Sequence, residues 1–298
     1  SFDPIQSKNG DFNINHTYKF SEGKGKWSSN ATQSFGDRDI EGYYNERIYS
    51  LNGLSYADGV DQQLFNASNN RITTVQSDFE YVFEKIKARM EAGAKAIIRN
   101  DAISTNSQQY DALSSTYIPD TLSNFDYIYD EQIYSIYGIF GQQLGKFSYQ
   151  GGIRGEFAKQ IPNLVSTVEK YTNSYLNLFP SAHVKYKPKK EIEYSVSYSR
   201  RINRADSRQL NPFASYADPF NIRKGNPALQ PEYINSFDLG YSLTKKKVIF
   251  STSVYHRRTV DVINRVKEYY SNNASAVTYA NIDKSESQLK ASNLAAVL

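Results

Sequence analysis

The sequence predicts an all-β protein whose antiparallel strands are joined by short hairpin turns. Three observations predict this class: the alternation of apolar and polar residues, the aromatic content and the regular spacing of turns. Of the 298 residues, 25 are Tyr and 16 are Phe, although only 39% of the chain is hydrophobic. Because disordered chains are poor in aromatic residues, a disordered chain is excluded.

Composition excludes several other classes. No apolar run approaches the roughly 18 residues that a membrane-spanning helix needs. The chain has no cysteine, which removes disulfides, thiolate metal sites and cysteine nucleophiles. The net charge is +4, from 35 basic and 31 acidic residues, so no nucleic-acid partner is indicated.

Alternation with a period of two marks the individual strands. In the first strand the apolar face and the polar face consist of Phe12, Ile14, His16, Tyr18 and Phe20 against Asp11, Asn13, Asn15, Thr17 and Lys19. The segments Phe147–Phe157 and Ile192–Arg201 repeat this pattern. One segment, Asp78–Ile98, fits a helix as well as it fits two strands by periodicity alone. The neighbouring hairpins favour two strands, with a turn at Glu84–Lys87.

Short and long connections alternate along the chain. Five short turns carry lysine: Ser21–Lys26, Glu84–Lys87, Leu144–Lys146, Lys187–Lys190 and Thr244–Lys247. Long polar connections are expected between them: Gly36–Arg71, Asn100–Asn124, Ala158–Ser174 and Ile202–Pro231. Ten strands are clear, and an eleventh is expected near Thr278–Ser285.

This asymmetry is typical of an antiparallel up-and-down transmembrane β-barrel, which has short periplasmic turns and long outer loops. Strands of about ten residues would cross the bilayer with tilt. Tyr and Phe would form the aromatic girdles, and a polar lumen explains the low hydrophobic content. A soluble β-sandwich, with the same apolar faces buried between two sheets, is the alternative.

A more specific pattern follows the strand that ends at Tyr198–Arg201 (YSRR). The next residues include NPF at Asn211–Phe213, DP at Asp218–Pro219 and GNPALQPE at Gly225–Glu232. The chain resembles the barrel of the TonB-dependent-receptor-like outer-membrane β-barrel proteins of Bacteroidota. Further similar stretches are Phe147–Glu156 (FSYQGGIRGE), Leu178–Tyr186 (LFPSAHVKY), Tyr255–Arg258 and Asp261–Ile263.

The resemblance covers about Asp11–Ser285 and implies a location in the outer membrane of a Gram-negative bacterium. A complete barrel of that kind has 22 strands and a plugged lumen, so residues 1–298 are expected to form part of one barrel domain of a longer protein, without its plug. The implied partners are outer-membrane lipid, a plug domain of the same full-length chain and the TonB complex. The implied function is gated uptake of a small-molecule, glycan or peptide ligand.

Two other functions stay open from the sequence. The barrel could display loops for binding or adhesion without transport, or a small closed barrel could act as a pore or an enzyme. No cofactor or metal is expected, because His16, His183 and His256 have no zinc-site spacing. No GxSxG nucleophile motif occurs either. We therefore expect a protein that is not an enzyme.

The candidate ligand-binding residues lie on lumen faces and in loops. Alternation places Arg89, Glu91, Lys95 and Arg99 on one lumen face, Arg154 and Glu156 on another, and Glu193 and Arg201 on a third. These charges would contact a plug or a solute, or would simply keep the lumen hydrated. Asp218 and Arg223 lie in a proline-rich loop, which could form a ligand mouth or a structural clasp. Tyr43 and Tyr44 lie in the first long loop, where tyrosines suit sugars or peptides.

Overall fold

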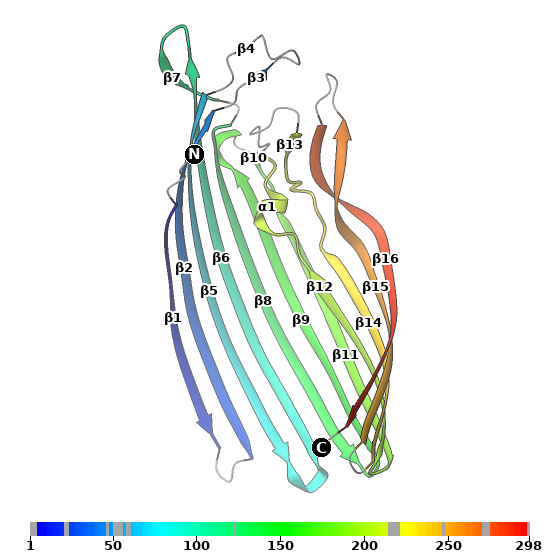
Figure 1. Cartoon of the computed structure of the whole chain (residues 1–298). Helices are drawn as coiled ribbons and strands as arrows, with labels where there is room; N and C mark the ends of the chain where they lie inside the picture. The colour runs from blue at the N-terminus through cyan, green and yellow to red at the C-terminus, as the bar shows by residue number, and fades with distance from the viewer. Residues whose placement is uncertain are drawn as a thin grey trace.

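The computed structural model describes residues 5–20, 24–45, 48–49, 56–57, 61–121, 123–167, 169–213, 221–245, 248–269 and 275–296. Eleven long strands form one curved antiparallel sheet in which each strand pairs with its neighbours in chain order (Figure 1). They are β1 (Ile5–Lys19), β2 (Gly25–Asn45), β5 (Asp61–Phe83), β6 (Ala88–Asp111), β8 (Phe125–Leu144), β9 (Phe147–Leu164), β11 (Asn173–Lys189), β12 (Ile192–Asn203), β14 (Glu232–Lys245), β15 (Val248–Tyr269) and β16 (Ser275–Ala296).

Shorter elements lie at the end opposite the hairpin turns (Figure 1). They are β3 (Ile48–Tyr49), β4 (Tyr56–Ala57), β7 (Thr116–Pro119), β10 (Glu169–Lys170), β13 (Asn221–Arg223), the helix α1 (Ser207–Leu210) and the 3-10 turn Val165–Thr167. The strand β13 pairs in parallel with the start of β16. Among the described residues, no helix is long and apolar enough to cross a membrane.

The predicted hairpin turns are confirmed at Glu84–Lys87, Leu144–Lys146 and Lys187–Lys190; at the other two places the flanking strands pair as predicted, while residues 21–23 and 246–247 lie outside the described residues. Each joins two consecutive antiparallel strands, and all lie at the same end of the sheet (Figure 1). The ambiguous segment 78–98 is two strands, joined by the 3-10 turn Glu84–Ile86 and by Lys87, whose φ is +49°. Gly145 occupies the same left-handed region, with a φ of +58°, in the turn between β8 and β9.

The predicted strand length of about ten residues was wrong, and so were three of the four predicted long connections; the fourth, Ile202–Pro231, does connect β12 to β14. The longest strands have 23 and 24 residues, and most of Gly36–Arg71 and Asn100–Asn124 is strand. In these extensions polar residues occupy both faces, as where Asp37 lies opposite Asn69. The hydrogen-bonded ladder continues there without an apolar face, so alternation cannot reveal it.

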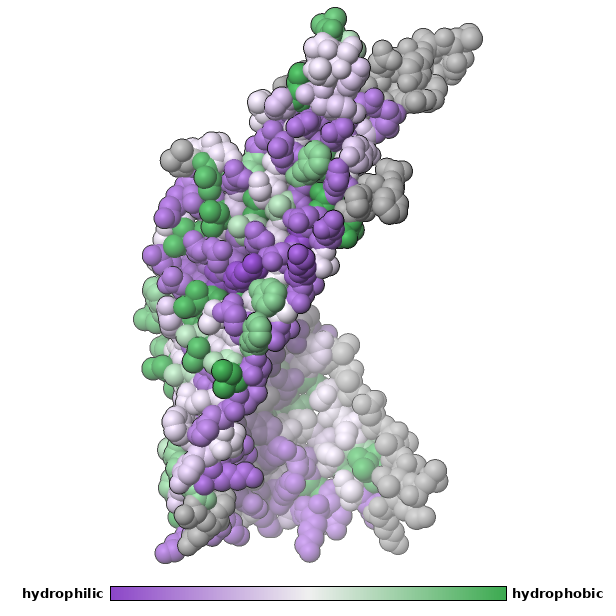
Figure 2. Space-filling model, turned by 90° about the vertical axis from the view of Figure 1, so that its left-hand side faces the viewer, coloured by the Kyte–Doolittle hydropathy of each residue, from purple (hydrophilic) through white to green (hydrophobic). Residues whose placement is uncertain are grey.

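Cross-strand register separates two faces of the wall. On the outward face apolar side chains meet across neighbouring strands, as with Val184 and Val196, and Val196 and Leu239. Ile14, Ile136 and Leu176 on this face expose 70% or more of their surface. Figure 2 shows hydrophobic residues gathered along one margin of the wall, beside a more hydrophilic hollow. Such a continuous exposed apolar face is suited to lipid.

An aromatic band follows the outward face close to the hairpin turns. Ring contacts between neighbouring strands are Phe147–Tyr186, Tyr186–Tyr194, Tyr194–Tyr241 and Tyr241–Phe250. In addition, Phe20, just after β1, contacts Phe79 of β5, and Tyr81 contacts Phe83 within β5. Centroid distances in this band lie between 4.5 and 6.4 Å. A band of this kind at one edge of an apolar face is the girdle expected at a bilayer interface.

The sheet is open in the part of the chain that the structure describes. β1 and β16 lie at opposite margins and do not pair with each other (Figure 1). A small closed barrel would require that pairing, so the closed-barrel alternative was wrong for these residues. The sandwich alternative was also wrong, because the only other described sheet is the pair of two-residue strands β3 and β4.

Candidate binding wall

The inner face of the wall carries a folded segment that we call the strap, residues 204–213 and 221–231 between β12 and β14. Its local fold starts at Asp206, which caps α1 by accepting a hydrogen bond from the Gln209 amide at 2.8 Å. The Gln209 side chain accepts from the Asp206 amide at 3.0 Å, completing a capping box. A Cβ on Gly225 would lie 2.5 Å from two strap carbonyl oxygens, so only glycine fits there.

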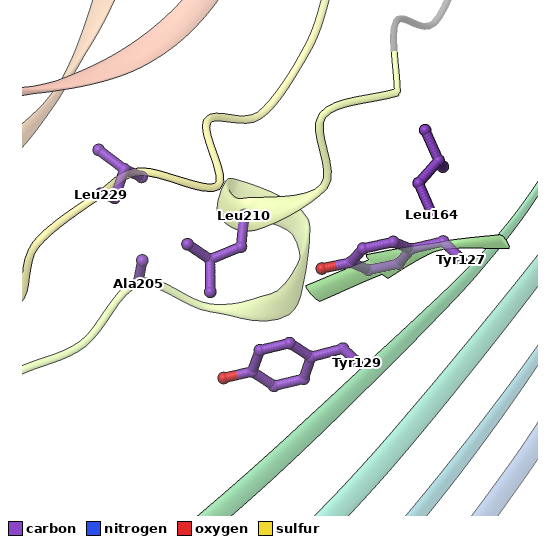
Figure 3. Packing of buried hydrophobic residues seen from close by; sticks show 6 residues of the cluster. All are labelled: Tyr127, Tyr129, Leu164, Ala205, Leu210 and Leu229. Atoms are coloured by element: carbon purple, nitrogen blue, oxygen red, sulfur yellow. The ribbon is translucent and has the colours of Figure 1, made fainter. Parts of the chain in front are cut away.

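Apolar packing holds the strap against the wall (Figure 3). The cluster combines strap and wall residues: Ala205, Leu210 and Leu229 with Tyr127, Tyr129 and Leu164. Leu210 and Tyr127 are fully buried. Phe213 stacks on Phe125 with ring centroids 3.9 Å apart. Burying one leucine side chain contributes roughly 1.5–3 kcal/mol, so the cluster fixes the strap to the inner face.

Hydrogen bonds from the wall satisfy the strap backbone. The Tyr127 hydroxyl donates to the Ser207 carbonyl at 2.9 Å, and the Gln160 amide donates to the Ala205 carbonyl at 3.2 Å. Asn173 donates to the Pro227 carbonyl at 2.9 Å. The sequence left two interpretations of this loop, a ligand mouth and a structural clasp. The described parts of the strap are bound to the inner wall by these hydrogen bonds, as a clasp would be.

Buried charges join the strap to the wall. Arg204 forms an ion pair with Glu156, whose side chain is only 6% exposed, and Arg154 approaches the same carboxylate at 3.6 Å. Burial lowers the pKa of the Arg204 guanidinium below its ordinary value. The Arg204 guanidinium also lies 5.6 Å from the ring centroid of Tyr175. One carboxylate is thus shared by two guanidinium groups, and the three side chains together carry one excess positive charge.

A second acidic group extends this network along the wall. Glu131 accepts hydrogen bonds from the Tyr129 hydroxyl at 3.0 Å and from Gln160 at 3.1 Å. Arg99 reaches the same carboxylate at 3.9 Å. The inner wall therefore holds a continuous polar layer in which buried charges are paired, as a low-dielectric environment requires.

A cavity of about 530 Å³ opens on the inner wall. It is lined by Tyr137, Gly152, Arg154, Phe179, Ser181, Ser199 and Arg201 among other residues, and no carboxylate of the described chain contributes to it. The Arg154 guanidinium lies 4.8 Å from the ring centroid of Phe179. Within the described chain, Arg201 makes no ion pair. The arrangement could hold an anionic or hydrogen-bonding group.

The structure brings together only part of the predicted site. Arg99, Arg154 and Glu156 belong to the layer under the strap, and Arg201 lines the adjoining cavity. Arg89 lies near the hairpin end, paired with Glu80 at 3.2 Å and Glu91 at 2.8 Å.

The remaining predicted residues lie at the other end. Tyr43 and Tyr44 belong to the end of β2 instead of a loop, and the Tyr43 hydroxyl donates to Glu41 at 2.5 Å. Arg223 is in β13, and Asp218 lies outside the described residues. These residues do not form one site with the layer under the strap.

Sequence reasoning missed Arg204, Glu131, Gln160 and Tyr175 as members of the layer. Arg204 and Glu156 are 48 positions apart, so no local pattern relates them. The alternation in β8 and β9 could have placed Glu131 and Gln160 on the inner face. In the described residues, no group of three or more His, Asp or Glu side chains could hold a metal ion.

The curved sheet, the lipid-facing apolar surface and the polar inner wall define part of an outer-membrane β-barrel. The chain belongs to the outer membrane protein beta-barrel family, whose model matches residues 18–292. Its location is therefore the outer membrane, as the sequence predicted. No curated protein matches the chain.

Several solved structures share this fold. The copper transporter OprC superposes with a TM-score of 0.68 at 11% identity, over 97% of this chain and 43% of OprC. The ferric citrate transporter FecA gives 0.61 at 11% identity, over 98% of this chain and 39% of FecA. The siderophore receptor PiuA from Acinetobacter baumannii gives 0.61 at 12% identity, over 95% and 43%. The chain thus spans less than half of each of these proteins, and the likeness is one of fold.

Proposed function

We propose that the chain is part of the wall of a TonB-dependent outer-membrane receptor that imports a ligand. The observation that carries this proposal is the polar inner wall, where Arg204 of the strap pairs with Glu156 of the wall, next to Arg154 and an open cavity. A wall that only displayed loops would need no such organised layer deep on its inner face. The resemblance to receptors of Bacteroidota supports the same function.

In this proposal residues 1–298 form one segment of a larger barrel of about 22 strands. A plug domain of the full-length chain occupies the lumen, and the TonB complex supplies the energy that moves it. Arg99, Arg154 and Arg201 contact the plug or the passing ligand, and the buried Glu156 contributes to this site by holding Arg154 in place. Tyr43, Tyr44 and Arg223 lie at the outer rim and meet the ligand first, whereas Arg89 lies near the periplasmic rim. Asp218, which lies outside the described residues, is proposed as a further ligand-binding residue.

The ligand is a small molecule, a metal chelate, a glycan or a peptide, and no covalent chemistry on it is required. The names of solved proteins with the same fold mention three ligands: ferric citrate for FecA, copper for OprC, and peptides for the RagAB peptide importer. These three classes supply the probes for a first test.

The test measures cell-associated and imported probe for labelled ferric citrate, copper ion and an oligopeptide mixture. Three strains are compared: the parent, a strain lacking the receptor gene and a strain lacking TonB. Import that requires both genes supports the proposal. Surface binding that requires the receptor but leads to no TonB-dependent import supports loop display and adhesion instead. If deletion of the receptor gene changes the uptake of none of the three probes, probes from other ligand classes are measured in the same three strains.

A variant pair links the function to the inner wall. Arg201→Gln should lower import at least several-fold because it removes a cation that lines the cavity, and Lys170→Gln serves as a control on the rim. Equal import by both variants, at equal amounts in the membrane, would contradict a role for the cavity.

A further inference from the structure

The lysines of the hairpin turns have no part in the function proposed above. The described tips 84–87, 145–146, 189–191 and 244–245 carry six exposed lysines, which we call the basic rim: Lys85, Lys87, Lys146, Lys189, Lys190 and Lys245. Two carboxylates, Glu84 and Glu191, share these tips, so the positive charge is in excess. All the tips lie at one end of the sheet (Figure 1).

The basic rim lies immediately beyond the aromatic band. Lys146 directly precedes Phe147, and Lys85 follows Phe83 by two positions. Exposed apolar side chains stand among the lysines, because Ile86 is 51% and Leu144 is 54% exposed. Aromatic rings and apolar tips beside cations mark the level of a bilayer interface, where a lysine can extend its amine to the head groups.

The lysines of the rim differ in their pairing from those on the adjoining strands. On the strands, Lys26 pairs with Glu80 at 3.1 Å, and Lys185 and Lys187 pair with Glu193 at 3.0 and 2.7 Å. In the described part of the chain none of the six rim lysines makes an ion pair. Their charges are therefore available to an external anion.

The backbone of Lys87 closes the turn between β5 and β6, with its N–H donating to the Glu84 carbonyl. Its φ of +49° lies in the left-handed region, which favours glycine, and the neighbouring turn has Gly145 at +58°. A lysine thus occupies a position where its Cβ opposes the local backbone geometry. No ion-pair partner among the described residues accounts for its amine.

We propose that the basic rim binds the phosphate groups of anionic phospholipids in the periplasmic leaflet of the outer membrane. The short turns of an outer-membrane barrel face the periplasm, which places the rim at that leaflet. Basic residues beside a membrane surface attract anionic lipid, and the attraction falls off within a Debye length. The proposal depends on the outer-membrane location alone and is independent of any ligand that the protein imports.

The test uses the full-length protein in phosphatidylcholine bilayers that contain spin-labelled phosphatidylglycerol or spin-labelled phosphatidylcholine. The motionally restricted fraction of each label gives the relative association constant of the two lipids. The unmodified protein should prefer phosphatidylglycerol about two- to fivefold at low salt. The preference should fall toward one at roughly 0.5 M salt, because screening shortens the range of the attraction.

A rim variant and a matched control locate the effect. The variant with Lys85→Gln, Lys87→Gln, Lys146→Gln and Lys190→Gln should lose the preference. The control with Lys8→Gln, Lys159→Gln, Lys170→Gln and Lys267→Gln loses the same net charge away from the tips, and should keep it. Heat-modifiable gel mobility confirms that both variants are folded, and a variant that fails this check is replaced by its single substitutions.

Three results would overturn the proposal: no lipid preference in the unmodified protein, an unchanged preference in the folded rim variant, or an equal loss in the control. The first would mean that the rim faces water or a protein partner. Lys87→Gly offers an additional check, since it removes one amine while relieving the backbone geometry. A decrease in preference with this variant therefore reports on the charge and not on a damaged turn.

Discussion

Glu156 is the residue on which the inner layer depends most. It is nearly buried, and its carboxylate is shared between Arg204 and Arg154. Its position on β9 faces the strap, which is tied down at the same place by Gln160 and Tyr127. The side chain therefore connects the electrostatics of the wall with the packing of the strap.

Glu156→Gln should lower the free energy of unfolding by roughly 3–5 kcal/mol, because it leaves Arg204 buried without a counter-charge. Glu193→Gln is the control, since Glu193 pairs with exposed lysines and its loss should cost about 1 kcal/mol or less. Urea unfolding of the full-length protein in lipid measures both. Equal costs would show that the buried pair has no special role.

Gly145 offers a prediction about a single backbone position. Gly145→Ala should destabilise the protein by about 1 kcal/mol, since its φ of +58° opposes a Cβ. At Gly151 in β9, a methyl group would have no neighbouring atom within 4 Å, so Gly151→Ala should be neutral or slightly stabilising. The same unfolding assay compares the two, and a larger cost at Gly151 would contradict the geometry.

At the scale of elements, the strap is a separate unit that packs on the sheet. The hydrogen-bonded ladder between β12 and β14 forms without any strap residue. β12 and β14 pair with each other along their whole length on either side of it. Loss of strap packing should therefore release the strap while the sheet stays intact.

Leu210→Ala tests this separation. It should remove roughly 2–5 kcal/mol of packing energy, because Leu210 is fully buried in the cluster between strap and wall. Limited proteolysis should then cut within 204–231 at least tenfold faster, with unchanged heat-modifiable mobility. Leu239→Ala on the lipid face is the control and should not alter cleavage. Concerted unfolding of the whole protein would disprove an independent strap.

The elements differed in how far the sequence could predict them. Alternation identified the faces of β9 and β12 and the turns at Glu84–Lys87 and Leu144–Lys146, because one face meets lipid. The outer half of β5 and β6 was taken for loop, since residues such as Asn70 and Asp101 are polar partners in the ladder. The position of the strap on the inner face depends on contacts between residues far apart in the sequence. Of the layer that anchors it, only Arg99, Arg154 and Glu156 were predicted from local alternation.

At the scale of the whole molecule, one wall separates lipid from a wet interior by a single layer of backbone. Adjacent residues of one strand consequently face opposite solvents. Val196 is 54% exposed on the apolar face, whereas the Ser197 hydroxyl lies on the inner face, 3.4 Å from Asp238.

Val196→Arg should therefore reduce the stability of the protein in bilayers by about 2–4 kcal/mol, as an arginine facing lipid near midplane does. Ser197→Arg adds the same charge one residue away, toward Asp238, and should change stability by less than about 1 kcal/mol. Folding titrations in phospholipid vesicles measure the difference. A similar cost for both would mean that the two faces have been assigned wrongly.

The parallel pairing of β13 with β16 limits where a further strand can join the sheet. Asn221, Ile222 and Arg223 occupy the free edge of β16 at Ser275, Ala276 and Val277, so those hydrogen-bonding groups are already used. A further strand that joins this margin can begin its ladder only beyond Val277, whereas the edge of β1 offers no such stop between Ile5 and Lys19. The short strand β13 thus fixes the position at which the next strand must start. It also covers one end of an edge strand that could otherwise pair with unrelated strands.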